Sequence, residues 1–525
     1  MAGASSERLD RGIIVISAVV VIGAFMSILD GTIVNVALAT LSRELHSPLH
    51  TIQWVATAYL VALAVVIPMT GWASERFGAK QLWMVVVALF VAGSALSGLA
   101  WSAGSLIFFR VLQGLGGGMI MPAGMTILAD AAGPQRIGRV MSIVGVPMLL
   151  APVFGPVVGG LILQSLSWHW IFFVNVPIGI LALGLASRLL PRSAPQPCER
   201  LDLRGLALLS PGLAAIVFGL SETSSQGGIA YVGAWGPIVA GIVLVGGFVW
   251  HARHSRTRRP LLDGQLFRSP AFAAASVTVL LIAAVVFGAL LVLPLYFQVA
   301  RGASTLATGL LLAPQGFGAA LVMPISGRLS DRVGGGVVSV FGLGVMTVAT
   351  VALAQLSAST PSTLTSAILL VRGVGLGCSM MPTTAAAYTT VSRAAVPQAT
   401  TIINVFQRVG GSLGSALLAV VLEDQIKAGV PSALRVTGGS IEPLPSAVRE
   451  RLATPLTEAF NHTLWWAVAL TALAIAPAIV VAARAPRRAG SDSRANPPRA
   501  RGDVSSQRQL HDTPPRPQPS HASTG

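Results

Sequence analysis

An acidic residue lies inside a long apolar segment near the beginning of the chain. Asp30 occurs within residues 13–38, a segment long enough to cross a bilayer, which takes about 20 apolar residues. A carboxylate there costs about 2.5–3.5 kcal/mol on insertion scales, so it usually faces a cavity, a partner charge or an ion pathway. We therefore predict that Asp30 is the working acid of a transporter. The alternative is a neutral, hydrogen-bonded carboxyl group that only holds helices together.

A basic residue lies inside another apolar segment at a similar expected depth. Arg110 falls in residues 104–129, and because arginine is not deprotonated in proteins, it needs a partner inside a bilayer. A nearby guanidinium favours the ionised carboxyl group, whereas burial favours the protonated one. Opening and closing of a cavity could shift this balance, so that Asp30 takes up and releases one proton per cycle. A static salt bridge, or an arginine that reaches to the membrane surface, is the alternative.

The composition indicates that a bundle of membrane helices positions these residues. Of the 525 residues, 53% are hydrophobic and only 10% are charged, and the mean hydropathy is +0.73. Soluble domains carry about 25% charged residues, and long unbroken apolar runs favour helices over a barrel. We predict an all-α integral membrane protein with fourteen transmembrane helices, at roughly 13–38, 51–72, 82–100, 104–129, 139–164, 169–190, 205–222, 235–251, 271–297, 305–327, 337–357, 362–390, 401–422 and 464–483.

The charges indicate an orientation and argue against several kinds of partner. The formal net charge is +16, but the arginines lie in short loops and in the tail rather than on one compact face, so no nucleic-acid partner is expected. Basic residues concentrate on one side if the N-terminus is cytoplasmic, which predicts that both termini are cytoplasmic. Arginine with little lysine suggests a GC-rich bacterial genome and thus a bacterial plasma membrane.

The sequence shows no pattern that is typical of an enzyme. It contains no phosphate-binding loop, no nucleophile with an apparent base and no histidine or cysteine spacing for a metal, so we predict neither metal nor cofactor. The two cysteines, Cys198 in a predicted loop and Cys378 in a predicted helix, lie at different depths, so no disulfide is expected.

An internal repeat indicates two related halves. Residues 68–78 and 324–334 share Pro, hydroxyl, Gly, Ser, acid, Arg and Gly at the same spacing. A looser match pairs Arg110 with Arg372, each followed by glycines and a Met-Pro step. Parallel repeats of this kind occur in transporters built from two helical halves.

The repeat predicts a plan of six, two and six helices. The predicted parts are a cytoplasmic N-terminus at 1–12, an N-terminal half at 13–190, a linker at 191–270 with inserted helices at about 205–222 and 235–251, a C-terminal half at 271–483 with an outer loop at 423–461, and a disordered cytoplasmic tail at 484–525.

Over residues 13–483 the chain resembles the fourteen-helix drug:proton antiporter branch of the major facilitator superfamily. Its fold would be two six-helix halves with two inserted central helices. In this family the loop that matches residues 71–80 is a conformational latch, and the arginine that matches Arg110 is linked to proton coupling. The residues that match the latch and its second copy are Gly71, Glu75, Arg76, Gly78, Lys80, Asp331 and Arg332. The alternative is that Arg76 and Lys80 only set the membrane topology. The second latch is expected to be weaker, because Gly335 and Gly336 stand where basic residues are common.

Other segments extend the resemblance. The residues Gly155, Pro156, Gly159 and Gly160 resemble the signature of antiporters, which implies export; simple helix packing is the alternative. Residues 168–179 resemble the start of the sixth helix of the branch. The candidates for a cavity or substrate site are Asn35, Gln113, Arg372, Asn404 and Arg408. An arginine reaching to the membrane surface is the alternative for Arg408.

These observations favour proton-coupled efflux of drugs, antibiotics or other small, largely apolar compounds by alternating access. The expected partners are the drug-like substrate, protons and membrane lipid, and the protein is expected to be a monomer. Two alternatives stay open at this point: an importer or facilitator of a small metabolite with the same fold, and a membrane sensor or scaffold that does not transport.

Overall fold

The structure is a computed structural model that describes residues 11–191, 201–225, 232–254, 262, 264–303, 305–357, 359–392, 395–429 and 446–484. Most of the predicted N-terminal segment lies outside these ranges, and its last two residues begin the first helix. The predicted tail also lies outside them, except for Arg484 at the end of the last helix.

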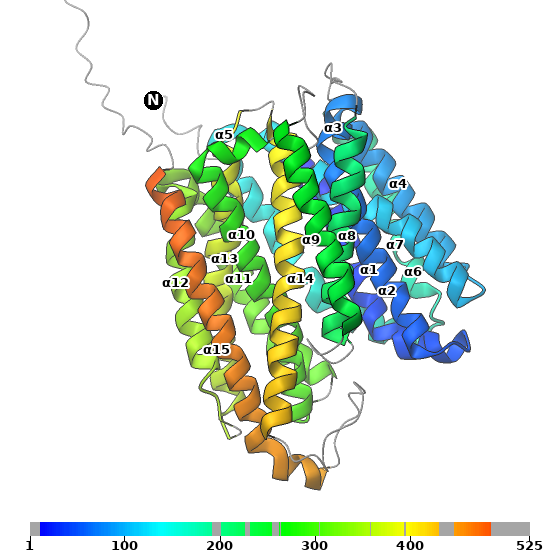
Figure 1. Ribbon diagram of the computed structural model, residues 1–525, viewed down its shortest axis with the longest axis vertical. Helices are drawn as coiled ribbons and strands as arrows, with labels where there is room; N and C mark the ends of the chain where they lie inside the picture. The colour runs from blue at the N-terminus through cyan, green and yellow to red at the C-terminus, as the bar shows by residue number, and fades with distance from the viewer. Residues whose placement is uncertain are drawn as a thin grey trace, which may run out of the picture. The chain divides into compact units, whose positions relative to one another are not determined.

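Every secondary-structure element in the described chain is a helix, and these residues form no strand, which confirms the predicted all-α fold class (Figure 1). The helices are α1 Arg11–Glu44, α2 Leu49–Val66, η1 Ile67–Met69, α3 Thr70–Phe77, α4 Ala79–Gly98, α5 Ala103–Ser165, α6 Trp170–Phe173, α7 Asn175–Leu189, α8 Leu203–Ser225, α9 Val232–His254, η2 Gly264–Arg268, α10 Pro270–Leu295, η3 Tyr296–Ala300, α11 Thr305–Val333, α12 Gly335–Leu353, α13 Ser362–Thr389, α14 Val396–Gly429 and α15 Ser446–Arg484.

Thirteen helices in the described parts of the chain are long and apolar enough to cross a membrane, so the protein is a multi-pass membrane protein. The remaining predicted span, at 139–164, is the second part of α5. That helix contains two predicted spans and departs from helical geometry at Gly133, whose φ of 64° and ψ of 172° turn the chain. Glycine adopts a positive φ with little strain because it has no Cβ.

Between the last two spans the structure differs from the prediction. The outer loop predicted at 423–461 is shorter, because α14 continues to Gly429 and α15 begins at Ser446. Only residues 430–445 of that loop lie outside the described chain. The charged residues 423–427 continue α14, where Lys427 pairs with Glu423 one turn earlier.

Helices α1–α7 and α10–α15 meet at one end of the bundle, the end with residues 71–80 and 327–334, which we call the basic end. The loop predicted at 71–80 is largely helical, because α3 extends over Thr70–Phe77 and α4 begins at Ala79. There α5 packs on α11 and α13. A Cβ on Gly145 of α5 would lie 2.7 Å from Cγ of Met381 and 2.9 Å from Cε of Met323. These methionines belong to one apolar core that includes residues of both groups of helices.

At the opposite end the two groups have separate cores. One core contains Leu29, Ile33 and Phe172 and draws only on α1–α7 and their connections. The other contains Leu293 and Phe460 and draws only on α10–α15. The two groups of helices are therefore joined by apolar contact mainly at the basic end.

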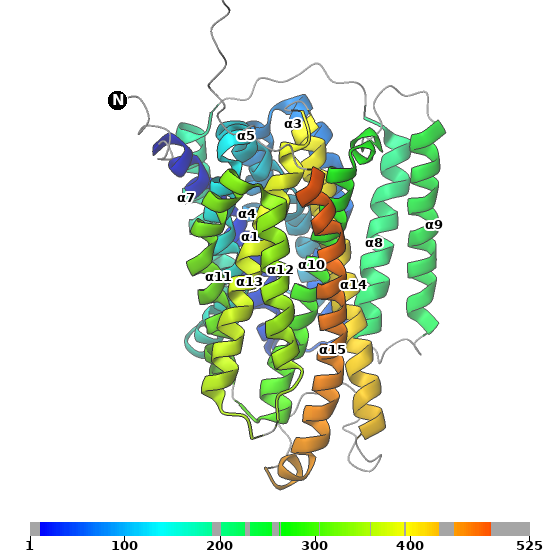
Figure 2. The same cartoon turned by 90° about the vertical axis from the view of Figure 1, so that its left-hand side faces the viewer.

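The two helices predicted as an insertion, at 205–222 and 235–251, extend over Leu203–Ser225 and Val232–His254. They lie side by side at the edge of the bundle, with α8 nearer to α14 (Figure 2). Their close contact depends on small residues, since a Cβ on Gly241 would lie 2.7 Å from the Gly212 carbonyl oxygen. Helix α8 contacts both α2 and α14, so it bridges the two groups of helices.

The close contacts of glycines align α5 with α13 differently from the alignment that was predicted by matching residue types. A Cβ on Gly114 of α5 would lie 2.7 Å from the carbonyl oxygen of Tyr59 in α2. A Cβ on Gly373 of α13 would collide with the carbonyl oxygen of Gln315 in α11. Tyr59 and Gln315 occupy the same place relative to the repeated segments 68–78 and 324–334. Gly114 and Gly373 are therefore equivalent positions.

This register corrects the predicted match of Arg110 with Arg372. Arg372 precedes its aligned glycine by one residue, as Gln113 does, so the two occupy equivalent positions. The position equivalent to Arg110 is Leu369, which is fully buried in an apolar core. The prediction was wrong because arginine was matched to arginine, whereas close helix contacts preserve the spacing of the glycines.

The close approach of α4 and α5 makes a testable prediction. A Cβ on Gly116 would lie 2.6 Å from the backbone nitrogen of Phe90, a contact that only a shift of a helix can relieve. We expect Gly116→Ala to lower the melting temperature of the purified protein by several degrees, although alanine favours helix by about 1 kcal/mol. Gly104→Ala is the matched control, because a Cβ at Gly104 meets nothing within 4 Å. Equal melting temperatures for both variants would contradict the close approach.

Candidate functional site

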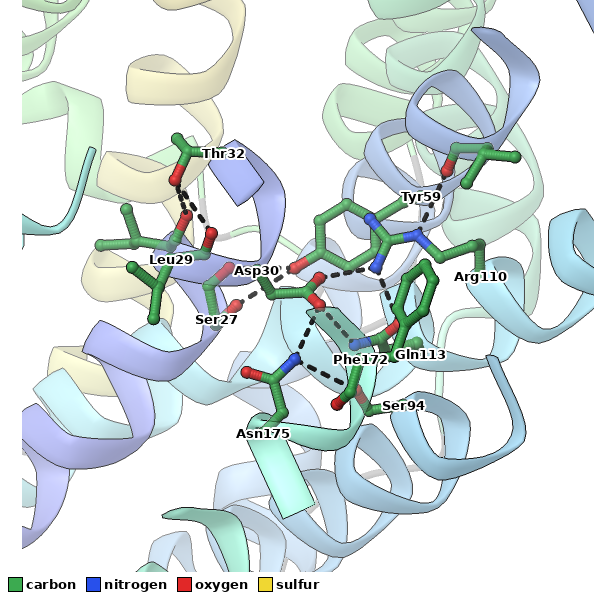
Figure 3. A network of polar contacts seen from close by, with 12 residues as sticks. Ser27, Leu29, Asp30, Thr32, Tyr59, Ser94, Arg110, Gln113, Phe172 and Asn175 are labelled. Carbon is green, nitrogen blue, oxygen red and sulfur yellow. Dashed lines mark hydrogen bonds and ion pairs between the residues drawn. The ribbon is translucent and has the colours of Figure 1, made fainter. Parts of the chain in front are cut away.

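The carboxyl group of Asp30 is fully buried and accepts three hydrogen bonds from side chains (Figure 3). Arg110 donates from Nη1 to Oδ2 at 2.6 Å. Gln113 donates from Nε2 to Oδ1 at 2.9 Å, and Asn175 donates from Nδ2 to the same oxygen at 2.8 Å. These donors stabilise the ionised form of the carboxyl group. The structure thus joins Asp30, Arg110 and Gln113, all of which the sequence predicted as site residues.

The guanidinium of Arg110 also has neutral partners. Its Nε donates to the carbonyl oxygen of Val55 at 3.2 Å, and Nη1 donates to Oε1 of Gln113 at 2.7 Å. Its Cζ lies 4.0 Å from the ring centroid of Tyr59, within the range of a cation–π contact. Gln113 therefore both accepts from the guanidinium and donates to the carboxylate.

Four side chains of this network were not among the predicted site residues. Asn175 begins α7 and also donates to Oγ of Ser94 in α4 at 3.0 Å, while Ser94 donates to the carbonyl oxygen of Phe172. Tyr59 of α2 shares a hydrogen bond of 3.3 Å with Ser27 of α1. The sequence signal for Asn175 was its place in the segment 168–179. Nothing in the sequence linked it to Asp30, from which it is separated by 145 residues.

Small residues let the helices of the network approach α5. A Cβ on Gly93 of α4 would lie 2.7 Å from the backbone nitrogen of Gln113. On the other side of α5, Gly114 lies against the backbone of Tyr59. Because α5 is in backbone contact with α4 and α2, short polar side chains reach each other directly between these helices.

Gly71 in α3 and Gly327 in α11 occupy equivalent places in the two copies of the predicted latch. Gly71 lies against the beginning of α14, where its Cβ would be 3.2 Å from Oγ1 of Thr401. Gly327 lies against α5, where its Cβ would be 2.8 Å from the carbonyl oxygen of Gly138. Each copy thus packs on a helix of the other group. Gly78 and Gly334 have φ values of 85° and 95° and precede α4 and α12.

Asp331, the acid of the second copy of the predicted latch, forms contacts between the two groups of helices. Oδ1 of Asp331 accepts a hydrogen bond of 3.1 Å from the backbone nitrogen of Gly138, and Oδ2 lies 3.5 Å from Nε of Arg139. A charge-assisted bond to a helix backbone of this kind is stronger than a neutral one. Asp331 therefore connects α11 to α5 at the basic end.

The other predicted latch residues lie in different settings. Lys80 donates to the carbonyl oxygens of Ser187 and Leu190 at 2.9 and 2.7 Å, which ties α4 to the end of α7. Glu75 is buried, whereas the side chains of Arg76 and Arg332 are exposed. Lysine at carbonyl groups of a helix C-terminus is a favourable charge–dipole arrangement.

The predicted cavity residues do not gather in one place. Asn35 is exposed, and at about 100° per residue it lies on the α1 face between Gly31 and Thr32. Gly31 faces Tyr59 of α2, and Thr32 faces Gly155 of α5. Asn35 is therefore exposed between α2 and the second part of α5.

The candidates in the second group of helices are more buried. Asn404 is buried and donates to the carbonyl oxygen of Thr400 in its own helix at 2.9 Å. Arg408 is half-buried and lines a small apolar pocket between α2, α8 and α14, next to Val405 and Leu213. Arg372 is buried among α11, α12 and α13.

The predicted antiporter residues have unequal surroundings. A Cβ on Gly155 would collide with the side chain of Thr32, so α1 and α5 approach closely there. At Gly159 it would make an ordinary contact, 3.4 Å from Cγ2 of Ile33, and at Gly160 it would meet nothing within 4 Å. The side chain of Pro156 lies outside the described part of the structure.

A buried acid–guanidinium pair within a multi-pass bundle with a repeated half is the arrangement of a membrane transporter. Residues 20–415 match the family model of the Major Facilitator Superfamily. The chain belongs to this superfamily and is a transporter rather than an enzyme.

Several relatives have names that concern drugs. The chain is 37% identical over 504 residues to the multidrug resistance protein B homolog of Mycobacterium tuberculosis strain H37Rv, with 93% of each chain covered. It is 30% identical over 415 residues to the tetracenomycin C resistance and export protein of Streptomyces glaucescens, covering 78% of this chain and 75% of the relative.

Solved structures share the fold. The human organic anion transporter MFSD10 superposes with a TM-score of 0.58 at 14% identity, covering 89% of this chain and 99% of that one. The proton:xylose symporter XylE superposes with a TM-score of 0.59, also at 14% identity, covering 88% and 94%. At these identities the comparison establishes the fold alone.

The hydrogen bond between Asp331 and Gly138 leads to a prediction about how often the basic end opens. Asp331→Ala removes a charge-assisted hydrogen bond, a class that contributes about 1.5–3 kcal/mol. We expect the end to open about tenfold more often. The measurement is the labelling rate of a single cysteine introduced at buried Val144, after replacement of Cys198 and Cys378.

Glu458→Ala, at an exposed position of α15, is the control and should not change the labelling rate. A labelling rate for Asp331→Ala no faster than that of this control would show that Asp331 does not hold the basic end closed.

Proposed function

We propose that the protein is a proton-coupled exporter of drug-like compounds in a bacterial plasma membrane. The observation that carries this proposal is the fully buried Asp30 carboxyl group with Arg110 at 2.6 Å. An ionisable residue inside a membrane protein is a functional candidate by default. The names of the relatives that concern multidrug resistance and tetracenomycin export support drugs as the substrate class.

The partners of Arg110 make a proton cycle at Asp30 physically reasonable. Removing one member of a buried ion pair usually costs about 3–5 kcal/mol, because the other charge is left unpaired. When Asp30 is protonated, Arg110 still has the Gln113 and Val55 oxygens and the Tyr59 ring. These neutral partners lower the free-energy cost of protonating Asp30, so the ion pair can break and form again within a cycle.

The packing of the two groups of helices supports alternating access. They share a core at the basic end, where Asp331, Gly71 and Gly327 connect them, and have separate cores at the opposite end. We assign the basic end to the cytoplasm, with both termini there, so that the described conformation is closed on the cytoplasmic side. Export would require this contact to open and the opposite end to close.

The proton gradient is sufficient to drive such a cycle. One elementary charge that crosses a potential of about 100 mV releases about 2.3 kcal/mol. Since a factor of ten corresponds to about 1.4 kcal/mol, this supports roughly 50-fold concentration of a neutral compound. In this proposal the protein works as a monomer, Asp30 carries the proton and Asn35 is exposed where substrate passes.

The first prediction of this proposal concerns the acid. Asp30→Asn keeps the size of the side chain but cannot exchange a proton, so we expect loss of proton-driven efflux in reconstituted vesicles with an imposed pH gradient. Cells that carry this variant should be as drug-susceptible as cells without the gene. Glu423→Gln is the control, because Glu423 is an acid of α14 that pairs with Lys427 within its own helix. Full gradient-driven efflux by Asp30→Asn would refute the proposal.

The second prediction concerns Asn175. Asn175→Leu removes one donor from the ionised carboxylate while Arg110 and Gln113 stay in place. The ionised form is then less stable, so we expect the pH profile of efflux to move to higher pH. Asn461→Leu is the matched control, since Asn461 donates to the Leu356 carbonyl oxygen away from the network. Coincident pH profiles for the wild-type protein and Asn175→Leu would argue against a role for Asn175 in proton exchange.

A further inference from the structure

We infer that Arg372 is the anchor of a second site, which binds a small monovalent anion such as chloride or a carboxylate group. Arg372 lies on α13 and is 1% exposed. Its Nη1 donates to Oε1 of Gln315 in α11 at 2.6 Å, and its Nε donates to Oγ1 of Thr350 in α12 at 3.4 Å. Both of these acceptors are neutral, so neither balances the charge of the guanidinium.

One nitrogen of the Arg372 guanidinium has no hydrogen-bond partner. Nη2 is buried, and no acceptor lies within hydrogen-bonding distance of it in the described residues. No described carboxylate forms an ion pair with Arg372 either, whereas Arg110 in the first group of helices is paired with Asp30. Arg372 is therefore a buried cation with two neutral acceptors and one nitrogen, Nη2, whose N–H groups are unused.

The helices that hold Arg372 and its two partners supply no counter-charge to it. Helices α10, α12 and α13 contain no acidic residue, and the acid of α11 is Asp331, which is bound to Gly138 at the basic end. Arginine does not lose its proton in proteins, so the charge cannot be removed by deprotonation. Burying a charge without a counter-charge is costly, and a bound anion would supply the counter-charge that Arg372 lacks.

Gln315 adds a second donor beside Arg372. Gln315 is only partly buried, and its Oε1 faces Arg372, which leaves its Nε2 as a second donor. A guanidinium N–H and an amide N–H together suit a small anion with one negative charge. The inference goes beyond the proposed function, because the site requires neither a drug nor a proton gradient.

The test is thermal unfolding of the purified full-length protein in sodium chloride, sodium acetate or sodium gluconate at equal ionic strength. Gluconate is the bulky reference anion. We expect chloride, acetate or both to raise the melting temperature saturably by several degrees in the wild-type protein. A shift with chloride identifies an inorganic anion, and a shift with acetate alone identifies a carboxylate group.

The variants assign the shift to Arg372. Arg372→Gln should abolish it, and Gln315→Leu should weaken the apparent anion affinity several-fold if Arg372→Gln does not fold. Arg301→Gln is the control, because Arg301 bonds to the Thr360 carbonyl oxygen at the opposite end and should keep the full shift. Equal melting temperatures in all three salts for the wild-type protein, or an undiminished shift in both variants, would overturn the inference.

Discussion

An ionised group in the interior of a membrane bundle is costly unless an opposite charge and hydrogen-bond partners surround it. Asp30 and Arg110 satisfy this requirement for each other at 2.6 Å, and Gln113 and Asn175 complete the hydrogen bonds of the carboxylate. Helices α1, α2, α4, α5 and α7 all contribute a group to this network. One buried pair of charges therefore connects five helices of the first group.

The second group of helices has the same glycine framework but different chemistry. Gly373 packs on α11 as Gly114 packs on α2, so the backbone arrangement is repeated. At the position equivalent to Arg110 stands Leu369, and at that of Gln113 stands Arg372. At these equivalent positions one half has an arginine paired with an acid, and the other has an arginine with neutral partners. Close helix packing constrains the small residues of the repeat, whereas the polar residues between the helices differ.

The sequence predicted the helices and the two principal charges because both follow from local patterns. Long apolar segments specify membrane helices, and an acid within one is conspicuous. The contacts of Asn175 and Tyr59 could not be predicted, because hydrogen bonds between distant segments depend on how helices rotate and approach. The register of Arg372 was mispredicted for the same reason, and the loop at 423–461 was predicted too long because charged residues can continue a helix beyond the membrane.

The most direct test of the central claim is an infrared difference spectrum of the purified protein between acidic and alkaline pH, with the carboxyl band assigned through Asp30→Asn. The account predicts a protonated carboxyl band that appears on acidification and is absent from the variant. A spectrum of the wild-type protein that matches that of the variant would show that Asp30 does not exchange a proton, and would contradict the account.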